Sequence, residues 1–195
     1  MNLNKITPAI FVKNLRRRTD RLEHMKDQMS KIGTRYEVYD VADHRGTLKS
    51  AMWWNAQNQL QIIRYAKEAR LPSVLVLDDD CVFVDDFNSK LAELWPHVPE
   101  NWDIVSFGEI FGRFAPVYPG IVKTDKSWGG HASLIRDTMY DKLLESITGA
   151  TWSDEEINIK LKRLINYYVF SPYLITQAPG YSDLKNQHVD NERFQ

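Results

Sequence analysis

A short apolar run that ends in three aspartates is the feature that most constrains this chain. Residues 74–77 read Val-Leu-Val-Leu, and Asp78, Asp79 and Asp80 follow without a break. An unbroken β-branched and aliphatic run of this length is typical of a strand covered on both faces. In open α/β sheets, ligands bind just past the carboxyl ends of such strands. The sequence therefore predicts a ligand site at the three aspartates.

The spacing of these carboxylates indicates that a cation belongs to the site. Three adjacent aspartates repel one another beside a buried strand, so a positive charge is needed to offset them. If the backbone stays extended, Asp78 and Asp80 point to one side and Asp79 to the other. Such an Asp-x-Asp pair suits a hard divalent ion held between protein oxygens and substrate phosphates. We expect Asp78 and Asp80 to be the metal-binding pair.

Strand and helix signals alternate along the chain, which indicates an α/β fold. Strands are predicted over 9–15 and 36–41, and the helical spacing of apolar residues between them predicts a helix over 20–32. A strand, helix, strand order of this length is a βαβ unit, which implies a parallel sheet. The later expected elements are helices over 51–70, 87–94 and 138–146 and from Ser153 on, strands over 102–107 and 173–177, a further strand after Gly130, an irregular or hairpin region over 110–125, and a polar loop after 177.

Length and composition bound the class of protein. The 195 residues, 43% of them hydrophobic, suffice for one substantial core, so we expect a single domain over 1–195. A formal net charge of -1 does not suggest an obligate nucleic-acid binder. The single cysteine, Cys81, excludes an internal disulfide and agrees with a reducing compartment. No segment approaches the ~20 apolar residues of a membrane span. We therefore expect a soluble, cytoplasmic protein.

Arginines gather between the first predicted strand and its helix. Arg16, Arg17 and Arg18 precede the helix, and Arg21 lies in its first turn. Cations at a helix N-terminus oppose the helix dipole unless an anion is bound there too. The pattern favours a seat for a nucleotide or its phosphates. A solvated, charged loop is the alternative for any one of these arginines.

Two later segments add candidate site residues. Gly129 and Gly130 precede a strand, where glycines allow either a close approach of the backbone to a ligand or a tight turn. Ser153 and Glu156 have the spacing of a capping box at the start of a helix. That explanation does not require Asp154, whose carboxylate near the helix N-terminus could face a cleft as a general base.

Six parts of the sequence, taken in order, form a pattern that resembles that of a known family. They are residues 11–21, 36–46, 74–82 and 130–135, then Asp154, then 172–183. In this order they resemble glycosyltransferase family 25, which includes lipooligosaccharide and collagen-modifying galactosyltransferases. The opening strand with its Asn-Leu and paired arginines is fairly specific, whereas an Asp-x-Asp triplet alone occurs often by chance.

The resemblance implies a GT-A fold, with a mostly parallel central sheet flanked by helices, a nucleotide-sugar donor, commonly a UDP-sugar, and a manganese or magnesium ion. By position, Asp78–Asp80 match the family's Glu-Asp-Asp, and Asp154 matches an acidic residue that opens a late helix. The family's closing motif is matched by Gln177, Ser182 and Asp183. This chain departs from the family in two places. Asp78 stands where the family has the longer glutamate, and residues 51–59 stand where the family has a glycine-rich segment. The expected nucleotide-binding residues are Asn14, Leu15, Arg16, Arg18, Arg21, Asp43, Asp78, Asp79 and Gly130.

The expected function is a metal-dependent, inverting transfer of a hexose from a nucleotide sugar to an acceptor hydroxyl. A divalent ion on the two phosphates would stabilise the charge that develops as the sugar-phosphate bond opens. Asp154, with Glu109 as the second candidate, would take the proton from the acceptor. A glycan, a protein side chain and a modified nucleic-acid base all fit as acceptors, although the near-zero net charge disfavours nucleic acid.

Two other functions fit parts of the sequence. A non-catalytic carbohydrate or nucleotide binding module of the same fold would bind nucleotide with metal and turn nothing over. The run into Asp78 also resembles the start of a response-regulator receiver domain. That signalling module needs a phosphorylatable aspartate at the end of a later strand and a Lys-Pro pair. Here the later strand ends in Ser106-Phe-Gly-Glu, and the chain contains no Lys-Pro.

Overall fold

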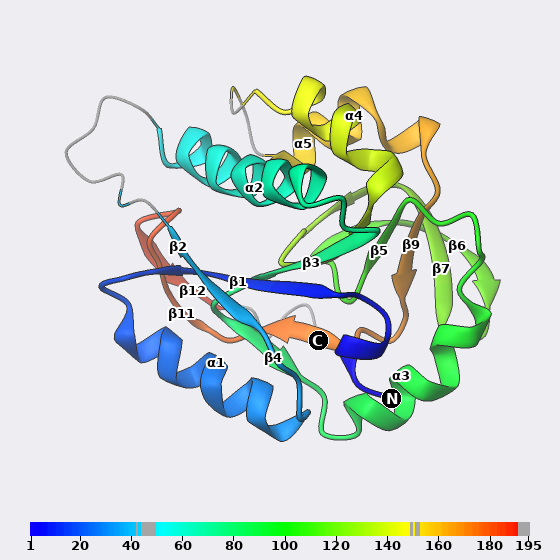
Figure 1. The fold of residues 1–195 in the computed structure, drawn as a ribbon, viewed down its shortest axis with the longest axis horizontal. Coiled ribbons are helices and arrows are strands. Elements are labelled where there is room, and N and C mark those ends of the chain that lie inside the picture. The colour runs from blue at the N-terminus through cyan, green and yellow to red at the C-terminus, as the bar shows by residue number, and fades with distance from the viewer. Residues whose placement is uncertain (42, 44–49, 149, 151–152, 191–195) are drawn as a thin grey trace.

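A central sheet with helices on both faces organises the chain. The computed structural model describes residues 1–41, 43, 50–148, 150 and 153–190. Figure 1 shows the sheet nearly edge-on between two layers of helices. The eight strands, in spatial order, are β2 (Glu37–Val41), β1 (Ala9–Leu15), β3 (Ser73–Asp78), β8 (Ala132–Arg136), β5 (Ile104–Ser106), β9 (Tyr167–Phe170), β7 (Ile121–Trp128) and β6 (Phe111–Tyr118).

The sheet is mostly parallel, as expected. β1 runs parallel to β2 and β3, and β5 runs parallel to β9. β8 is antiparallel to β3 and β5, and β7 is antiparallel to β9 and β6. Thus β7 and β8 oppose the direction shared by the other strands. The predicted α/β class is confirmed.

The buried strands contribute side chains to two hydrophobic cores, one on each face of the sheet. Along β3, Leu75 and Leu77 pack with the core beneath α1 (Thr19–Lys31) and α3 (Phe87–Leu94), because alternate side chains leave a strand on the same side. Val74 and Val76 face the other core, which α2 (Ala51–Glu68), α4 (Tyr140–Ser146) and α5 (Ser153–Lys160) cover. This two-sided burial is why residues 74–77 show no alternation with polar residues.

Element ends follow local chemistry. The hydroxyl of Ser50 accepts a hydrogen bond from the Trp53 backbone N–H at 3.1 Å and so caps α2. Gly33 follows α1 with a φ of +61°, a left-handed conformation that glycine adopts without a Cβ penalty. The predicted helix over 51–70 ends earlier, at Glu68, because Arg70 has a positive φ.

The region over 110–125 is the β6–β7 hairpin, one of the two structures that the sequence left open. The predicted polar loop after 177 is wrong. Instead β11 (Gly180–Ser182) pairs with β12 (Gln187–Val189). The strand predicted over 173–177 is confirmed as β10 (Ile175–Gln177), which pairs with β4 (Cys81–Phe83). The short 3-10 turns are η1 (Leu3–Lys5), η2 (Trp95–His97), η3 (Asp137–Met139) and η4 (Lys162–Leu164).

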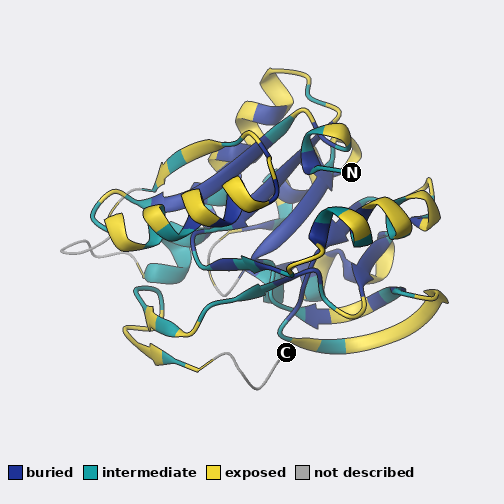
Figure 2. Cartoon of the chain, turned by 90° about the horizontal axis from the view of Figure 1, so that it is seen from below, coloured by how far each residue is buried: buried dark blue, intermediate teal, exposed yellow. Residues whose placement is uncertain are grey.

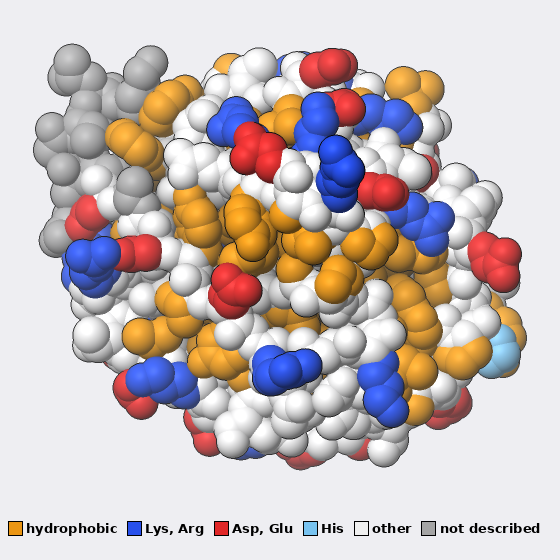
Figure 3. Space-filling view, in the orientation of Figure 1, with side chains coloured by type: hydrophobic (Ala, Val, Ile, Leu, Met, Phe, Trp, Pro, Cys, Tyr) orange, Lys and Arg blue, Asp and Glu red, His pale blue; other side chains and the backbone are white. Residues whose placement is uncertain are grey.

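The surface carries no single sign of charge on the face that Figure 3 shows, where Lys and Arg alternate with Asp and Glu. Exposed residues lie along the outer sides of the helices, and the central strands are buried (Figure 2). Among the described residues, no helix combines the length and the apolar character needed to cross a membrane.

Candidate active site

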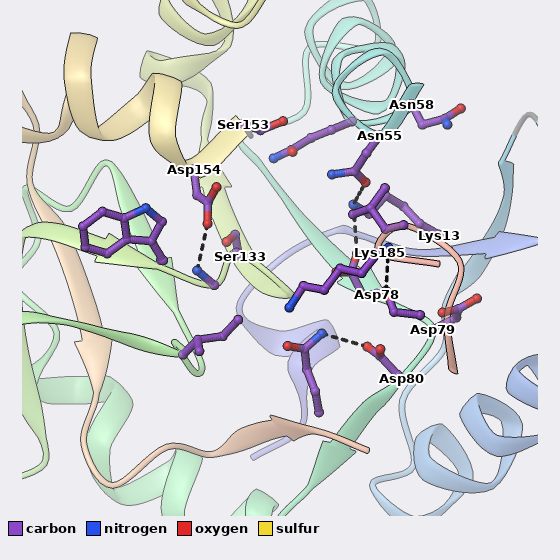
Figure 4. Close-up of a pocket in the computed structure, with 18 of the residues that line it drawn as sticks. Lys13, Asn55, Asn58, Asp78, Asp79, Asp80, Ser133, Ser153, Asp154 and Lys185 are labelled. Carbon is purple, nitrogen blue, oxygen red and sulfur yellow. Dashed lines mark hydrogen bonds and ion pairs between the residues drawn. The ribbon is translucent and has the colours of Figure 1, made fainter. Parts of the chain in front are cut away.

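A cavity of about 420 Å³ lies at the edge of the sheet where β1 and β3 end and β8 begins. The antiparallel β8 starts at the edge of the sheet where β1 and β3 end, so side chains from β1, β3 and β8 meet there. Figure 4 shows Asp78, Asp80 and Lys13 on one side of the cavity and Asp154 with Ser133 on the other. The ammonium of Lys185 extends between the two sides.

The three aspartates lie at the carboxyl end of β3, as predicted: Asp78 is its last residue, and Asp79 and Asp80 follow it. Asp78 forms an ion pair with Lys13 at 2.8 Å. Arg21 contacts Asp79 at 2.6 Å and Asp80 at 3.3 Å. The amide of Gln177 donates a hydrogen bond to Asp80 at 3.1 Å. The triplet therefore brings β1, α1 and β10 together around the end of β3.

Burial acts against the charge on these aspartates. It raises the pKa of Asp79 to about 6, although Arg21 opposes the shift. Burial also raises the pKa of Asp80, and the neighbouring carboxylate of Asp78 adds to this rise. Among the described residues, these three carboxylates form ion pairs with two cations, Lys13 and Arg21. A site with this excess negative charge favours an additional cation.

Asp78 and Asp80 fit a divalent ion of a particular kind. Among the described residues, no three His, Cys, Asp or Glu side chains form a complete metal cage. Magnesium-like ions usually keep several waters and bind through one or two carboxylates plus substrate phosphates. Two carboxylates at a solvent-connected cavity, with room for a phosphate, meet that requirement.

Neutral amides from α2 form a second part of the cavity, which we call the amide wall (Asn55, Asn58 and Gln59). Asn55 accepts a hydrogen bond from Lys13 at 3.2 Å. Asn58 is 2% exposed and donates to the backbone carbonyl of Trp54 at 2.8 Å. These three positions share one helical face, since residues three and four apart are neighbours. Amides offer both donors and acceptors, as recognition of hydroxyl groups requires.

The far side of the cavity holds a second charged cluster, made of Asp154, Glu109 and Lys162. Asp154 accepts backbone N–H hydrogen bonds from Gly129 at 3.2 Å and from Glu155 at 3.0 Å. Burial raises the pKa of Asp154 above its usual range. Glu109 is 2% exposed and accepts a hydrogen bond from the Tyr167 hydroxyl at 2.7 Å.

Lys162 is the buried cation of this second cluster. It is 2% exposed, and its ammonium lies 3.5 Å from the centroid of the Tyr167 ring. Burial lowers its pKa to about 8, while Glu109 and Asp154 act in the opposite direction. The two carboxylates therefore offset part of the cost of burying this ammonium.

The predicted capping box at Ser153 is wrong. The Ser153 hydroxyl is buried and makes no hydrogen bond to the part of the chain that the structure describes. Glu156 accepts hydrogen bonds from the backbone N–H of Thr148 at 2.6 Å and from its hydroxyl at 3.0 Å. Glu156 is 3% exposed, so it serves the connection from α4 to α5. Ser153 lines the cavity instead.

The β11–β12 hairpin closes one side of the cavity, and arginines hold it there. The carboxylate of Asp183 forms ion pairs with Arg17 at 2.7 Å and with Arg18 at 2.5 Å. Burial opposes ionisation of Asp183, but these hydrogen bonds prevail and lower its pKa. The backbone carbonyl of Tyr181 accepts from Arg21 at 2.9 Å. The arginines predicted to hold a phosphate thus also hold the C-terminal hairpin.

Comparison with known proteins identifies the fold. No protein-family model matches the chain, and no curated protein matches it in sequence. A glycosyltransferase involved in the glycosylation of the major capsid of PBCV-1 aligns over 95% of this chain and 97% of its own, at 14% identity and a TM-score of 0.59. A mutant Drosophila β1,4-galactosyltransferase 7, solved with manganese, UDP-Gal and xylobiose, aligns over 95% of this chain and 77% of its own, at 11% identity and a TM-score of 0.53. The fold is of the GT-A type.

Identity this low shows the fold alone, and membership of glycosyltransferase family 25 stays a prediction. The GT-A architecture does bear on one of the alternatives that the sequence left open, the receiver domain. A receiver domain has an open sheet of the flavodoxin-like order, whereas here the antiparallel β8 lies between β3 and β5. The receiver hypothesis is not supported.

The cavity brings together most of the residues singled out from the sequence. Those that line it are Leu15, Arg21, Asp78, Asp79, Asp80, Glu109, Gly129, Gly130, Ser153, Asp154, Gln177, Ser182 and Asp183. Gly130 has a φ of +71°, and a Cβ there would meet no atom within 4 Å, so its turn borders open space. Contact of Gly130 with a nucleotide stays a prediction.

The other predicted nucleotide-binding residues lie outside the cavity lining. Asn14 is buried, and its amide donates to the Leu15 carbonyl at 2.9 Å. Arg16 pairs with Asp40, and its side chain is 88% exposed. Arg18 and Asp43 take part in the ion pairs around the hairpin, where Asp43 meets Arg17 at 2.9 Å. Their contact with a nucleotide stays a prediction.

Several cavity residues were not found from the sequence, although some left a signal. Lys13 is a charged residue inside an apolar strand, and the register places it beside Asp78. The amide wall left a helical spacing of Asn and Gln in α2. Lys162 left no signal, because only the turn at η4 returns it to the cavity.

Proposed function

We propose that the protein is a metal-dependent, inverting glycosyltransferase that moves a hexose from a UDP-sugar to an acceptor hydroxyl. The observation that carries the proposal is the convergence of Asp78 and Asp80 with an opposed carboxylate cluster in one cavity of a GT-A fold. The manganese and UDP-Gal bound by the β1,4-galactosyltransferase neighbour support the choice of metal and nucleotide.

The acidic side of the cavity would hold the donor. Asp78 and Asp80 would bind a manganese or magnesium ion, which neutralises the charge that develops on the diphosphate when the sugar-phosphate bond opens. Arg21 and Lys185 also line the cavity and would supply positive charge for the phosphates. The Leu15 backbone and Gly130 lie close enough to the cavity to contact the nucleoside.

The opposite side would activate the acceptor. In an inverting displacement, the proton acceptor stands across the anomeric carbon from the leaving diphosphate, as Asp154 stands across the cavity from Asp80 (Figure 4). The raised pKa of Asp154 makes it a stronger base than an exposed aspartate. Glu109 is the second candidate, and the buried Lys162 belongs to the same cluster.

Turnover of nucleotide sugars tests this function. We would incubate the protein with Mn²⁺ and UDP-, GDP- or dTDP-hexoses and measure release of the nucleoside diphosphate. We expect one UDP-sugar to be turned over, and Asp80→Ala to lower the rate by about 100-fold or more, because a positioned charge is typically worth that much to a transition state. Asp27→Ala removes an exposed helix aspartate that pairs with Lys31 and serves as the matched control.

An Asp80→Ala protein that turns over the sugar at the wild-type rate would contradict the proposal. Circular dichroism of each variant separates loss of chemistry from loss of fold. If the protein binds UDP with Mn²⁺ but releases no sugar to any acceptor, the chain is a non-catalytic nucleotide-sugar binding module instead. Asp154→Asn should leave UDP binding intact while lowering transfer, because its carboxylate lies on the other side of the cavity.

A further inference from the structure

An exposed aromatic ring stands at the mouth of the cavity. Phe111 opens β6, is 51% exposed and lines the cavity. The other large apolar side chains exposed on β6, Phe114, Val117 and Tyr118, lie outside that lining. Exposed aromatic surface is unfavourable in water, and at the edge of a binding site it commonly marks contact with a ligand.

The ring of Phe111 packs against a second aromatic ring. It stacks on Trp128 with the ring centroids 4.6 Å apart and the planes at 23°. The indole N–H of Trp128 donates to Glu155 at 2.7 Å, and the ammonium of Lys126 lies 4.8 Å from the centroid of the Trp128 ring. Trp128 is therefore tied to α5 by one hydrogen bond. We call the stacked pair of Phe111 and Trp128 the aromatic platform.

The platform adjoins the carboxylates at the far side of the cavity. Gly129 follows Trp128, and its N–H is the donor that Asp154 accepts. A Cβ at Gly129 would lie 2.8 Å from both the Cα and a carboxylate oxygen of Glu109, so only glycine permits this approach. The strand end that carries the platform thus also positions both candidate bases.

The charges around the platform select among ligands that can cover an aromatic ring. Three carboxylates, those of Asp154, Glu155 and Glu109, lie next to it. Among the described residues, the nearby ammonium groups are the two of Lys126 and Lys162. The carboxylates outnumber the ammonium groups, so a phosphate-bearing ligand such as an oligonucleotide would be disfavoured. A pyranose ring has an apolar C–H face that can cover Phe111, and hydroxyl groups that can donate to carboxylates. A pyranose without charged groups is not repelled by these carboxylates.

We propose that the aromatic platform binds a pyranose ring of a neutral saccharide and that this saccharide is the acceptor. The claim that this saccharide is the acceptor rests on the proposed transfer function, whereas the claim that the platform binds a pyranose does not. The sugar stacks on Phe111 with a hydroxyl directed to Asp154. A free nucleic-acid strand and an unglycosylated peptide are excluded as acceptors by this assignment.

Saturation-transfer NMR tests the platform without needing turnover. The probes are methyl glycosides of galactose, glucose, mannose and xylose, together with lactose, cellobiose and xylobiose, each in the presence of Mn²⁺ and UDP. We expect at least one probe to bind, with the strongest transfer to the C–H protons of one ring face. Phe111→Ala should weaken its affinity by about tenfold, a typical cost for a central aromatic contact.

Two variants control for folding and for surface apolarity. Phe111→Trp keeps an aromatic face and should retain binding. Phe114→Ala removes an exposed phenylalanine from the same strand, outside the cavity, and should bind as the wild type does. The proposal is overturned if no saccharide of the panel binds, if Phe111→Ala binds equally well, or if a single-stranded oligonucleotide binds in a Phe111-dependent way.

Binding of UDP, measured in the same samples, keeps this result apart from the proposed function. Saccharide binding that depends on Phe111, without any binding of UDP, supports the platform and refutes the transferase. Binding of UDP without any saccharide binding refutes the platform and leaves the donor site intact.

Discussion

At the scale of single residues, the site holds more carboxylates than the described cations that pair with them. In the described part of the chain, Asp78, Asp79 and Asp80 form ion pairs with only two cations, Lys13 and Arg21, so the carboxylates outnumber their ion-pair partners. Burial makes this excess costly, because the free energy of a charge rises as water is removed from it. The raised pKa values of Asp79 and Asp80 are the direct result.

This charge balance predicts how stability depends on pH. The pKa of Asp79 rises from 3.8 to about 6 in the folded state, so between these values the folded protein binds more protons than the unfolded chain. The free energy of unfolding should therefore fall as pH rises through this window, by roughly 1–3 kcal/mol for a shift of this size. Asp79→Asn should flatten the fall, as measured by urea unfolding without metal at pH 4, 5, 6 and 7.

Asp86→Asn is the matched control for this titration, because Asp86 is an exposed aspartate that pairs with Lys90. It should leave the slope unchanged. A slope in Asp79→Asn as steep as in the wild type would show that Asp79 is not the group that takes up the proton.

At the scale of elements, the β11–β12 hairpin is held to the sheet by ion pairs. Asp183 joins it to Arg17 and Arg18, whose side chains are 27% and 16% exposed. Such a partly buried, charge-assisted pair is stronger than a surface ion pair. The hairpin carries Lys185 into the cavity, so its attachment and the donor site are linked.

Breaking that attachment should loosen the hairpin selectively. In Asp183→Asn, we expect amide hydrogen exchange over 180–189 to quicken by about tenfold, equivalent to a loss of about 1.4 kcal/mol in local stability. Exchange in β1 and β3 should not change. Asp125→Asn breaks the exposed pair with Arg113 on the β6–β7 hairpin and should leave 180–189 unaffected. Unaltered exchange over 180–189 in Asp183→Asn would show that other contacts hold the hairpin.

Local sequence signals predicted those parts of the structure that depend on short stretches of chain. The buried strand before Asp78 and the helix over 20–32 have clear periodicity, and both are present. The hairpin after 177 was missed because its strands are three residues each and mostly polar. The false capping box at Ser153 arose because Glu156 turns to Thr148, a contact that no local pattern reveals.

At the scale of the whole molecule, the sheet order turns scattered residues into one site. β1 and β3 are adjacent in space and far apart in sequence, which places Lys13 beside Asp78. The antiparallel β8 delivers Gly130 to the same edge, and α2 crosses above it with the amide wall. The mostly parallel class could be predicted from alternating strands and helices, but the positions of β7 and β8 depend on long-range packing.

The central claim is that Asp78 and Asp80 bind a metal that in turn binds a nucleoside diphosphate, and calorimetric binding of Mn²⁺ with and without UDP tests it most directly. If both ligands share one site, each should tighten the other by the same factor, and we expect that factor to be about tenfold or more. Asp80→Asn should abolish the coupling, whereas Asp27→Asn should preserve it. Equal Mn²⁺ affinity with and without UDP in the wild-type protein, or full coupling in Asp80→Asn, would contradict the account.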